Sequence, residues 1–448
     1  MSPFKLSPSV ENLKLFFTNF SDLDKRLDPL YYFSVNNLEI VNATKYPVRK
    51  LSDIITMTRG RFGHRPRNDP RFYDGEYPFI QTGDIVRANQ TNGKITYSQT
   101  LNELGLKTSR LFDKPTVVIT IAANIGDTAI LDYPACFPDS LIGMQPKDSS
   151  IMLEYINLYF KFIKNYLNDL APQSAQKNIN YQQLSPVPIV VPPLDIQKKA
   201  VETYEKALSL KAEKEQQAKN LLSEIDTYLL GELGISTPIQ DNSLEKRIFS
   251  VKLQSISNSR FDPLWYFNKN YRFERGCYTN QKLREIANIE KGSSISSSGI
   301  EAGIYPVIAG GQTSPYSHNT YNQDENVITV SASGAYAGFV WHHDYPIFAS
   351  DCSVIRSKNE NRISTLFLFE ILKVKQKEIY FLQQGAGQPH VYPKDLALLE
   401  IPIPPFELQE KLLLKIKSIR DKAIGLQREA AQELEQAKRD VEAMILGE

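Results

Sequence analysis

The sequence predicts an α+β fold in which two β-rich domains are separated by two long helices that pair as an antiparallel coiled coil. Two observations carry this prediction. The chain repeats itself: RLDPLYYF begins at Arg26 and RFDPLWYF at Arg260, and the stretch 175–199 is answered by the stretch 387–411. Each repeat then ends in a long segment with helical spacing of its apolar residues. An internal repeat constrains the architecture more strongly than any local signal, so we expect a pseudo-twofold duplication.

Each half contains short segments typical of β-strands. YPFI at Tyr77–Ile80 is matched by YPVI at Tyr305–Ile308, and TVVITIAA at Thr116–Ala123 is matched by NVITVSAS at Asn326–Ser333. Alternating branched residues bounded by glycine, asparagine, aspartate and proline are the usual strand signal. We therefore expect equivalent strands in the two halves.

An amphipathic segment and a proline pair follow the strands in each half. We expect one helix over Met152–Asn168 and another over Ser364–Phe381. The pairs Pro192-Pro193 and Pro404-Pro405 cannot continue a strand or a helix. They place the expected domain boundaries at 1–190, 191–235, 236–402 and 403–448.

The segments beyond the proline pairs predict long helices. Asp195–Leu230 contains no proline or glycine, and Leu408–Leu446 contains one glycine, Gly425. Their apolar residues recur mostly every three or four positions, although Lys211 and Lys214 interrupt the first stripe. Such a stripe is buried against a partner. We expect the two helices to pair with each other; packing of each helix onto its own domain is the alternative.

Composition is that of an ordinary globular protein. The 448 residues are 42% hydrophobic and 23% charged, with a net charge of +1, which excludes a globally basic nucleic-acid binder but permits a local basic face. Cys136, Cys277 and Cys352 lie far apart, which argues against a zinc site or a disulfide framework. No signal peptide or membrane-length apolar run is evident. We expect a cytoplasmic protein with no membrane partner.

The order of these parts resembles a known family. Pro188–Gln197 and Pro402–Gln409 each carry a proline pair followed by glutamine, and Gln176–Leu184 and Gln388–Leu396 precede them. Each stretch is a weak signature alone, but all occur twice in the same context. With two variable β-rich domains and two long helices, the whole chain resembles the specificity (S) subunits of type I restriction–modification systems.

The resemblance implies a function without catalysis. Each target-recognition domain would read one half of a bipartite site on double-stranded DNA. The helices would set the spacing and hold two methyltransferase (M) subunits, and two restriction (R) subunits could join them. Adenine methylation and DNA cleavage would belong to those partners. This chain would therefore bind no cofactor, and S-adenosylmethionine, ATP and magnesium are expected on the partner subunits.

The residues themselves support the absence of an active site. DPLY at Asp28–Tyr31 and DPLW at Asp262–Trp265 come nearest to the Asp/Asn-Pro-Pro-aromatic loop of amino-methyltransferases, but leucine replaces the second proline. No glycine-rich cofactor element accompanies them. We expect docking strands there, with arginine–aspartate pairs inside each motif. The adjacent His342 and His343 would face opposite sides of a strand, so we expect no metal site.

An arginine-rich loop is the sharpest candidate for DNA contact. Arginine suits both phosphate contacts and the bidentate reading of guanine. The alternative is a solvated loop whose arginines pair with surface carboxylates. The counterpart in the second half, Glu290–Gly303, carries a serine run and one lysine, Lys291. The candidates in the stretch Thr58–Phe72 are Arg59, Arg61, His64, Arg65, Arg67 and Arg71.

A second and a third candidate group are rich in amides and aromatic residues. Glutamine and asparagine can pair with adenine, whereas lysine and histidine suit phosphates; the amides could instead cap the strand that follows. The second group precedes the proline pairs and contains Gln173, Gln176, Lys177 and Asn178 in the first half, and Gln383, Gln384, Gln388 and His390 in the second. The third group lies in a loop and contains Gln312, Tyr316 and His318.

Two other functions compete with DNA recognition. A coiled-coil scaffold could join two protein-binding β-domains without touching DNA, but the arginine loop disfavours it. A methyltransferase acting alone lacks its cofactor motif. DNA specificity is therefore the function that the sequence predicts.

Overall fold

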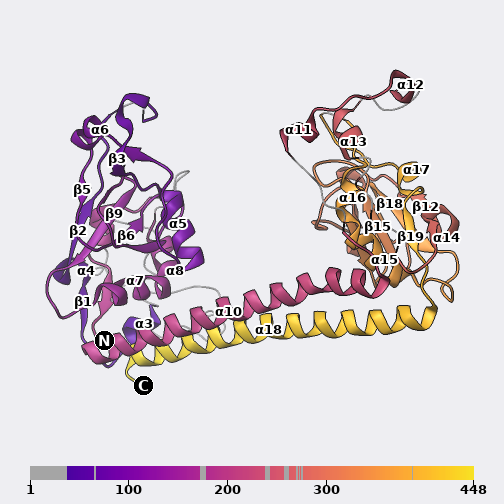
Figure 1. Cartoon of the computed structure of the whole chain (residues 1–448). Helices are drawn as coiled ribbons and strands as arrows, with labels where there is room; N and C mark the ends of the chain where they lie inside the picture. The colour runs from indigo at the N-terminus through magenta and orange to yellow at the C-terminus, as the bar shows by residue number, and fades with distance from the viewer. Residues whose placement is uncertain are drawn as a thin grey trace. The chain divides into compact units, whose positions relative to one another are not determined.

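The computed structural model describes residues 38–64, 67–171, 178–237, 243–256, 262–268, 271, 273, 276–385 and 387–448. The chain divides into two compact units, which Figure 1 shows. The first unit contains Met1–Glu215 and Arg428–Glu448, and the second contains Gln216–Gln427. The first copy of the repeated motif, at Arg26, lies outside the described residues.

The core of the first unit is a four-stranded antiparallel sheet. Its strands are β2 (Ile55–Arg59), β9 (Leu141–Pro146), β6 (Thr116–Thr120) and β7 (Thr128–Leu131), in that order. The predicted strand at Thr116 is confirmed as β6, which is buried at every position. Smaller ladders join β1 (Val48–Lys50) to β10 (Pro188–Val190), β3 (Tyr73–Pro78) to β4 (Thr100–Leu101), and β5 (Leu111–Phe112) to β8 (Ala135–Cys136).

Short helices cover this sheet and lead into its strands. The helices within 39–54 and 153–184 share one core cluster with one face of the sheet, whereas Ile85 and Ala88 pack with Val118 in a second cluster. The helices of the first unit are α3 (Glu39–Asn42), α4 (Leu51–Ile54), η2 (Pro70–Phe72), α5 (Thr82–Thr91), α6 (Glu103–Thr108), α7 (Leu153–Phe162), α8 (Lys164–Leu170) and α9 (Tyr181–Leu184).

The second unit repeats the same sheet. Its strands are β12 (Ala287–Lys291), β18 (Cys352–Ser357), β15 (Val327–Ser331) and β16 (Val340–His343), again in that order. The predicted strand at Asn326 is confirmed as β15. The other strands are β11 (Asn280–Lys282), β13 (Ala302–Ile308), β14 (Ser317–His318), β17 (Phe348–Ala349) and β19 (Glu400–Pro402). The helices are α11 (Leu244–Arg247), α12 (Leu253–Ile256), α13 (Pro263–Asn268), α14 (Leu283–Ile286), η3 (Ser297–Gly299), α15 (Thr365–Val374), α16 (Gln376–Tyr380) and α17 (Pro393–Leu396).

Two local predictions are wrong. The amphipathic segments form two helices each, because Ile163 between α7 and α8 and Lys375 between α15 and α16 have ψ angles of 11° and 9°. The expected docking strand at Asp262 is the short helix α13, because the Asp262 carboxylate accepts hydrogen bonds from the backbone N–H groups of Leu264 and Trp265 at 3.0 and 3.2 Å. A carboxylate in this position caps a helix start.

The two long helices are confirmed as α10 (Leu194–Leu233) and α18 (Phe406–Leu446). In the first unit, Ala200 and Tyr204 of α10 share a core with Val441 of α18 and with the sheet. In the second unit, Ile225 of α10 shares a core with Leu412 of α18, again with the sheet. The start of each helix thus meets the end of the other, so the pairing is antiparallel. The apolar stripe of each helix packs both against the other helix and against the helix's own domain. The two packing arrangements considered for these stripes therefore occur together.

The interrupted part of the α10 stripe has an electrostatic partner. Lys214 Nζ lies 3.0 Å from Glu429 Oε2 and 2.9 Å from Glu433 Oε1 of α18, and its side chain is only 16% exposed. The hydrogen bonds that Lys214 donates to Glu433 and Glu429 raise its pKa. A lysine that breaks the apolar pattern therefore still faces the partner helix.

The glutamine of the proline-pair signature explains why that stretch occurs twice. The Gln197 side chain accepts from Met152 N at 2.9 Å and donates to Ser150 O at 2.9 Å and Pro192 O at 2.8 Å. Gln409 makes the same contacts with Ser364 N, Arg362 O and Pro404 O at 3.2, 2.8 and 3.0 Å. Both amides are fully buried. Each fixes the start of a long helix against the start of the helix that covers the sheet. Across the residues described, no helix is long and apolar enough to span a membrane.

Candidate nucleic-acid interface

Each sheet brings the ends of two strands to one edge. In the first unit, Arg59 at the end of β2 pairs with Ile142 of β9, and Thr120 at the end of β6 pairs with the neighbouring Leu141. Since adjacent strands lie about 4.8 Å apart, the two strand ends are roughly 10 Å apart. The arginine loop leaves from the first end and the loop after β6 from the second.

The second unit has the same edge. Lys291 at the end of β12 pairs with Ser353 of β18, and Ser331 at the end of β15 pairs with the neighbouring Cys352. Lys291 and the loop after β15 therefore occupy the positions that Arg59 and the loop after β6 occupy in the first unit. The candidate loops of both halves lie at equivalent edges.

A glycine fixes the start of the divergent loop in each unit. Gly60 N donates to Leu141 O at 2.9 Å, and Gly292 N donates to Cys352 O at 2.9 Å. A β-carbon would lie 2.3 Å from Pro138 O at Gly60 and 2.2 Å from Ser350 O at Gly292, so only glycine fits. The scaffold is thus the same up to this residue, after which one copy continues with arginines and the other with serines.

Several arginines of the first loop have acidic or carbonyl partners. Arg59 Nε donates to Asp139 O at 2.6 Å, and Arg67 pairs with the Asp139 carboxylate. Arg71 Nη2 lies 2.6 Å from Asp69 Oδ2, and Arg71 Nε also donates to this carboxylate. The alternative of surface ion pairing therefore describes part of the loop. These partners hold the guanidinium groups in place, and the side chains of Arg67 and Arg71 remain 48% and 74% exposed.

His64 shares the carboxylate that holds Arg71. Its Nε2 lies 3.0 Å from Asp69 Oδ2, and its ring stacks on Phe72 with centroids 4.0 Å apart. Hydrogen bonds from Arg71, with a further one from His64, hold the pKa of Asp69 well below its usual range. Asp69 is therefore a charged anchor for the loop at any physiological pH.

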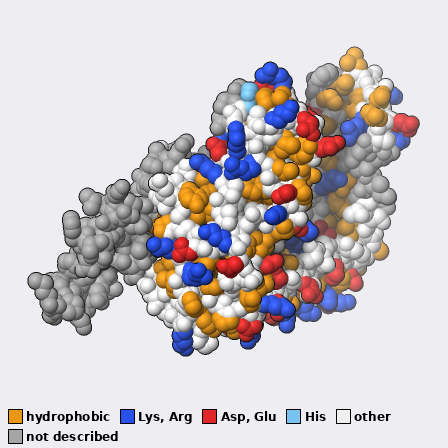
Figure 2. Space-filling view, turned by 90° about the vertical axis from the view of Figure 1, so that its left-hand side faces the viewer, with side chains coloured by type: hydrophobic (Ala, Val, Ile, Leu, Met, Phe, Trp, Pro, Cys, Tyr) orange, Lys and Arg blue, Asp and Glu red, His pale blue; other side chains and the backbone are white. Residues whose placement is uncertain are grey.

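Arg61 is a further exposed arginine of this loop. Its backbone is fixed, since Arg61 N donates to Phe137 O at 2.9 Å and Ser109 Oγ donates to Arg61 O at 2.7 Å. Its side chain is exposed. Figure 2 shows lysine and arginine side chains gathered beside a histidine at the upper end of this face. Arg65, also a candidate, lies outside the described residues.

The second unit gathers its amide candidates around the end of β15. His390 bridges Ser333, and Gln384 and His390 exchange backbone hydrogen bonds at 2.8 and 2.7 Å. The Gln384 side chain donates to Asp395 Oδ2 at 2.6 Å, and the Gln383 side chain donates to Ala337 O at 2.7 Å. These two amides thus brace the loop. Gln388, between them and His390, is exposed.

The third candidate group is divided by the structure. Gln312 and Tyr316 are exposed. Burial raises the pKa of Tyr380, and Gln312 opposes this shift. His318 is only 8% exposed; its Nδ1 accepts from Glu301 N at 3.1 Å, and its ring meets Phe348 edge-on. We therefore leave His318 out of the surface proposed below.

Of the corresponding candidates in the first unit, the structure describes only Asn178. Asn178 is exposed and bridges Ala122, and Ile179 N donates to Ile121 O at 2.9 Å. This places Asn178 beside the loop after β6, as His390 is beside the loop after β15. The other candidates of this group, Gln173, Gln176 and Lys177, lie outside the described residues.

With two equivalent sheets, divergent edge loops and a duplicated glutamine clamp in place, the comparison with known proteins is decisive for the family. The family described as "Type I restriction modification DNA specificity domain" matches residues 44–223 and 278–436. This chain belongs to that family. The resemblance inferred from the sequence is thereby confirmed.

Individual relatives match over shorter stretches. The Type I restriction enzyme MpnII specificity subunit of Mycoplasma pneumoniae is 29% identical over 166 residues, which cover 32% of this chain and 49% of the relative. The MjaVIII specificity subunit of Methanocaldococcus jannaschii is 32% identical over 117 residues, 26% of this chain and 27% of the relative. The chain spans about half the length of the first curated relatives that it matches.

A solved structure shows the same fold over most of the chain. The structure described as "Structural basis underlying complex assembly and conformational transition of the type I R-M system" contains a chain that is similar to this one, with a TM-score of 0.57 and 14% sequence identity. The match covers 89% of this chain and 96% of that chain. The predicted fold class, two β-rich domains with two long paired helices, is the fold of this specificity-domain family.

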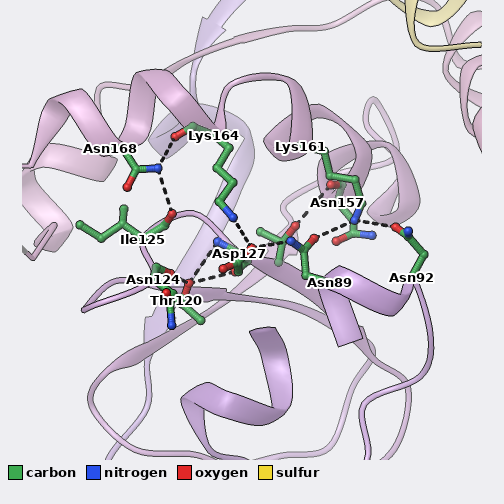
Figure 3. Close-up of polar contacts among 11 residues, drawn as sticks. Asn89, Asn92, Thr120, Asn124, Ile125, Asp127, Asn157, Lys161, Lys164 and Asn168 are labelled. Atoms are coloured by element: carbon green, nitrogen blue, oxygen red, sulfur yellow. Dashed lines mark hydrogen bonds and ion pairs between the residues drawn. The ribbon is translucent and has the colours of Figure 1, made fainter. Parts of the chain in front are cut away.

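One polar network of this specificity domain, centred on Asp127, was not predicted from the sequence. Asp127, 3% exposed, accepts from Lys164 Nζ at 2.6 Å and from the Asn89 amide, and its backbone pairs with Thr120. Figure 3 shows how it joins the loop after β6 to α5 and α8. Burial lowers the pKa of the adjacent Lys161 to about 8, while Asp127 opposes the shift and Lys164 adds to it. No sequence signal could find this network, because its members come from separate elements.

The histidine pair and the acidic residues do not form a metal site where the structure can be described. Within those residues, no three His, Cys, Asp or Glu side chains are placed to hold an ion. His343 is fully buried with Nε2 2.8 Å from Thr329 Oγ1, while His342 bonds Asn326 and its ring lies against Phe369. Both histidines therefore make contacts that stabilise the fold.

Proposed function

We propose that this chain is the DNA-specificity subunit of a type I restriction–modification complex. Each unit reads one half of a bipartite site on double-stranded DNA. The helix pair holds two adenine methyltransferase subunits, and two restriction subunits complete the nuclease. The chain itself catalyses nothing and binds no cofactor; S-adenosylmethionine, ATP and magnesium act on the partner subunits, and the complex works in the cytoplasm.

One observation carries this proposal. Gly60 and Gly292 hold the two sheet edges in the same geometry, yet the loops that leave them differ in chemistry. A common scaffold with different loops is what the reading of two different half-sites requires, since base contacts specify and phosphate contacts position.

Each unit carries its own part of the proposed contact surface. Exposed guanidinium groups suit phosphates or guanine, and exposed amides suit adenine. In the first unit it contains Arg59, Arg61, His64, Arg65, Arg67, Arg71, Gln173, Gln176, Lys177 and Asn178, and in the second Lys291, Gln312, Tyr316, Gln388 and His390, with Gln383 and Gln384 bracing the last loop.

The test is to co-express the chain with its adenine methyltransferase subunit and sequence the methylated bases of the host DNA. We expect one bipartite motif with an unread spacer between its halves. A complex that assembles but methylates no bipartite motif, and that binds no DNA, would instead favour the scaffold without DNA contact.

A further inference from the structure

The repeated motif has a described copy whose aromatic residues are anchored. Tyr266 of α13 is 7% exposed, and Trp265 lines a cavity with Phe273 and Phe381. Asp262 caps the helix. These contacts explain the aromatic residues and the aspartate of this copy of the motif.

They do not explain the leucine between them. Leu264 lies on the same short helix and is 71% exposed, although the motif has leucine at this position in both copies, Leu264 and Leu30. The helices that precede α13 in the chain expose further apolar residues: Leu253 is 81% exposed and Leu244 is 78% exposed. A single exposed leucine is common on its own, but the one in α13 recurs at the same position of the repeated motif.

Another exposed position shows that the two halves are free to differ. Ile304 of β13 is 81% exposed, and the matching residue of the first half, one position before the YPFI segment, is Glu76. The edge loops differ as well. Leu264, which the packing of α13 does not require and which is matched by a leucine in the first half, therefore points to a partner that is the same for both halves.

We propose that Leu264 belongs to a docking surface for the methyltransferase subunit. This inference rests on the proposed function, in which the two halves contact different DNA sequences but identical copies of that subunit. DNA offers no common apolar surface to two different half-sites. The methyltransferase would receive Leu264 in an apolar groove, and burial of one leucine strengthens binding by about tenfold or more.

The experiment compares two charge substitutions in the full chain. Leu264→Glu places a carboxylate in the proposed groove, whereas Ile304→Glu introduces the residue that the first half already carries. Each variant and the unaltered chain are titrated with the purified methyltransferase subunit, and the complexes are counted by native mass spectrometry. Thermal unfolding of Leu264→Glu, with Leu264→Ser as a second variant, checks that the fold is retained.

We expect two methyltransferase copies on the unaltered chain and on Ile304→Glu. For Leu264→Glu we expect the second copy to bind at least about tenfold more weakly, with Leu264→Ser intermediate. Equal affinities for Leu264→Glu and Ile304→Glu would overturn the inference while leaving the proposed function intact. So would self-association of the unaltered chain that Leu264→Glu abolishes. Failure of the unaltered chain to bind any methyltransferase would overturn both.

Discussion

Glu370 and Arg420 form a bidentate ion pair that ties α15 to α18 in the second unit. The Nη2–Oε2 distance is 2.7 Å, and the Glu370 side chain is 2% exposed. The glutamine clamps set the correspondence between the halves, and by that register the same positions in the first unit carry Leu158 and Leu208, which pack in one apolar cluster. Burial raises the pKa of Glu370, and Arg420 opposes this shift.

The first prediction uses this natural exchange. Arg420→Leu leaves the buried Glu370 carboxylate without its counter-charge and should destabilise the second unit by about 3–5 kcal/mol. Glu370→Leu leaves an arginine that is 34% exposed, and should therefore cost less. The double variant, which restores the leucine pair of the first unit, should lie within about 1 kcal/mol of the unaltered chain or above it. Urea unfolding of the four chains gives the comparison. A double variant as unstable as the sum of the single ones would contradict the prediction.

The second prediction concerns pH. Burial lowers the pKa of His343 to about 4, with His342 adding to the shift and Asp344 opposing it. The folded ring therefore stays neutral where an unfolded histidine, with a pKa near 6.5, becomes protonated. The unfolded state then binds more protons, so His343 costs no stability above pH 6.5 and a growing amount as pH falls from 6.5 to about 4.

The measurement is the unfolding free energy of the chain and of His343→Gln between pH 7.5 and pH 4.5. The unaltered chain should lose about 1.4 kcal/mol more per pH unit below pH 6.5 than the variant does. At pH 7.5 His343 is neutral in both the folded and the unfolded state, so the two curves should run parallel there. Parallel curves over the whole range would show that His343 does not titrate as described.

The third prediction concerns the spacer. Four residues inserted after Ala212 lengthen α10 by about 6 Å if the helix continues. DNA advances about 3.4 Å per base pair, so we expect an unread spacer longer by one or two base pairs. The half-site sequences serve as the internal control and should not change. An active insertion variant with its original spacer and altered half-site bases would exclude the helices as the determinant of spacing.

Much of the fold could be predicted because the chain is duplicated. The strands at Thr116 and Asn326 and both long helices recur in sequence and in the structure. The breaks at Ile163 and Lys375 could not be predicted, since the apolar pattern continues through them. The place of Lys214 in the helix pair could not be predicted either, because its partners, Glu429 and Glu433, lie more than 200 residues away in the sequence.

The candidate surface could be predicted only in part from the sequence. Residue type and loop composition identified the arginine loop, but not that Asp69 and Asp139 would hold Arg71 and Arg67. His318 was chosen for its chemistry, and only the structure shows that it is buried. Exposure and distant partners depend on tertiary packing, which local patterns do not encode.

The central claim is that each unit reads its own half-site, and methylated-base sequencing tests it most directly. One complex carries Arg61→Ala with Arg67→Ala in the first unit; a second carries Lys291→Ala with Gln388→Ala in the second unit. A lost bidentate base contact costs about 1–3 kcal/mol of discrimination, and each lost phosphate contact lowers the salt dependence of binding. We predict that the first complex relaxes the bases of one half-site only and the second complex those of the other. Equal relaxation of both half-sites by either complex would contradict the account.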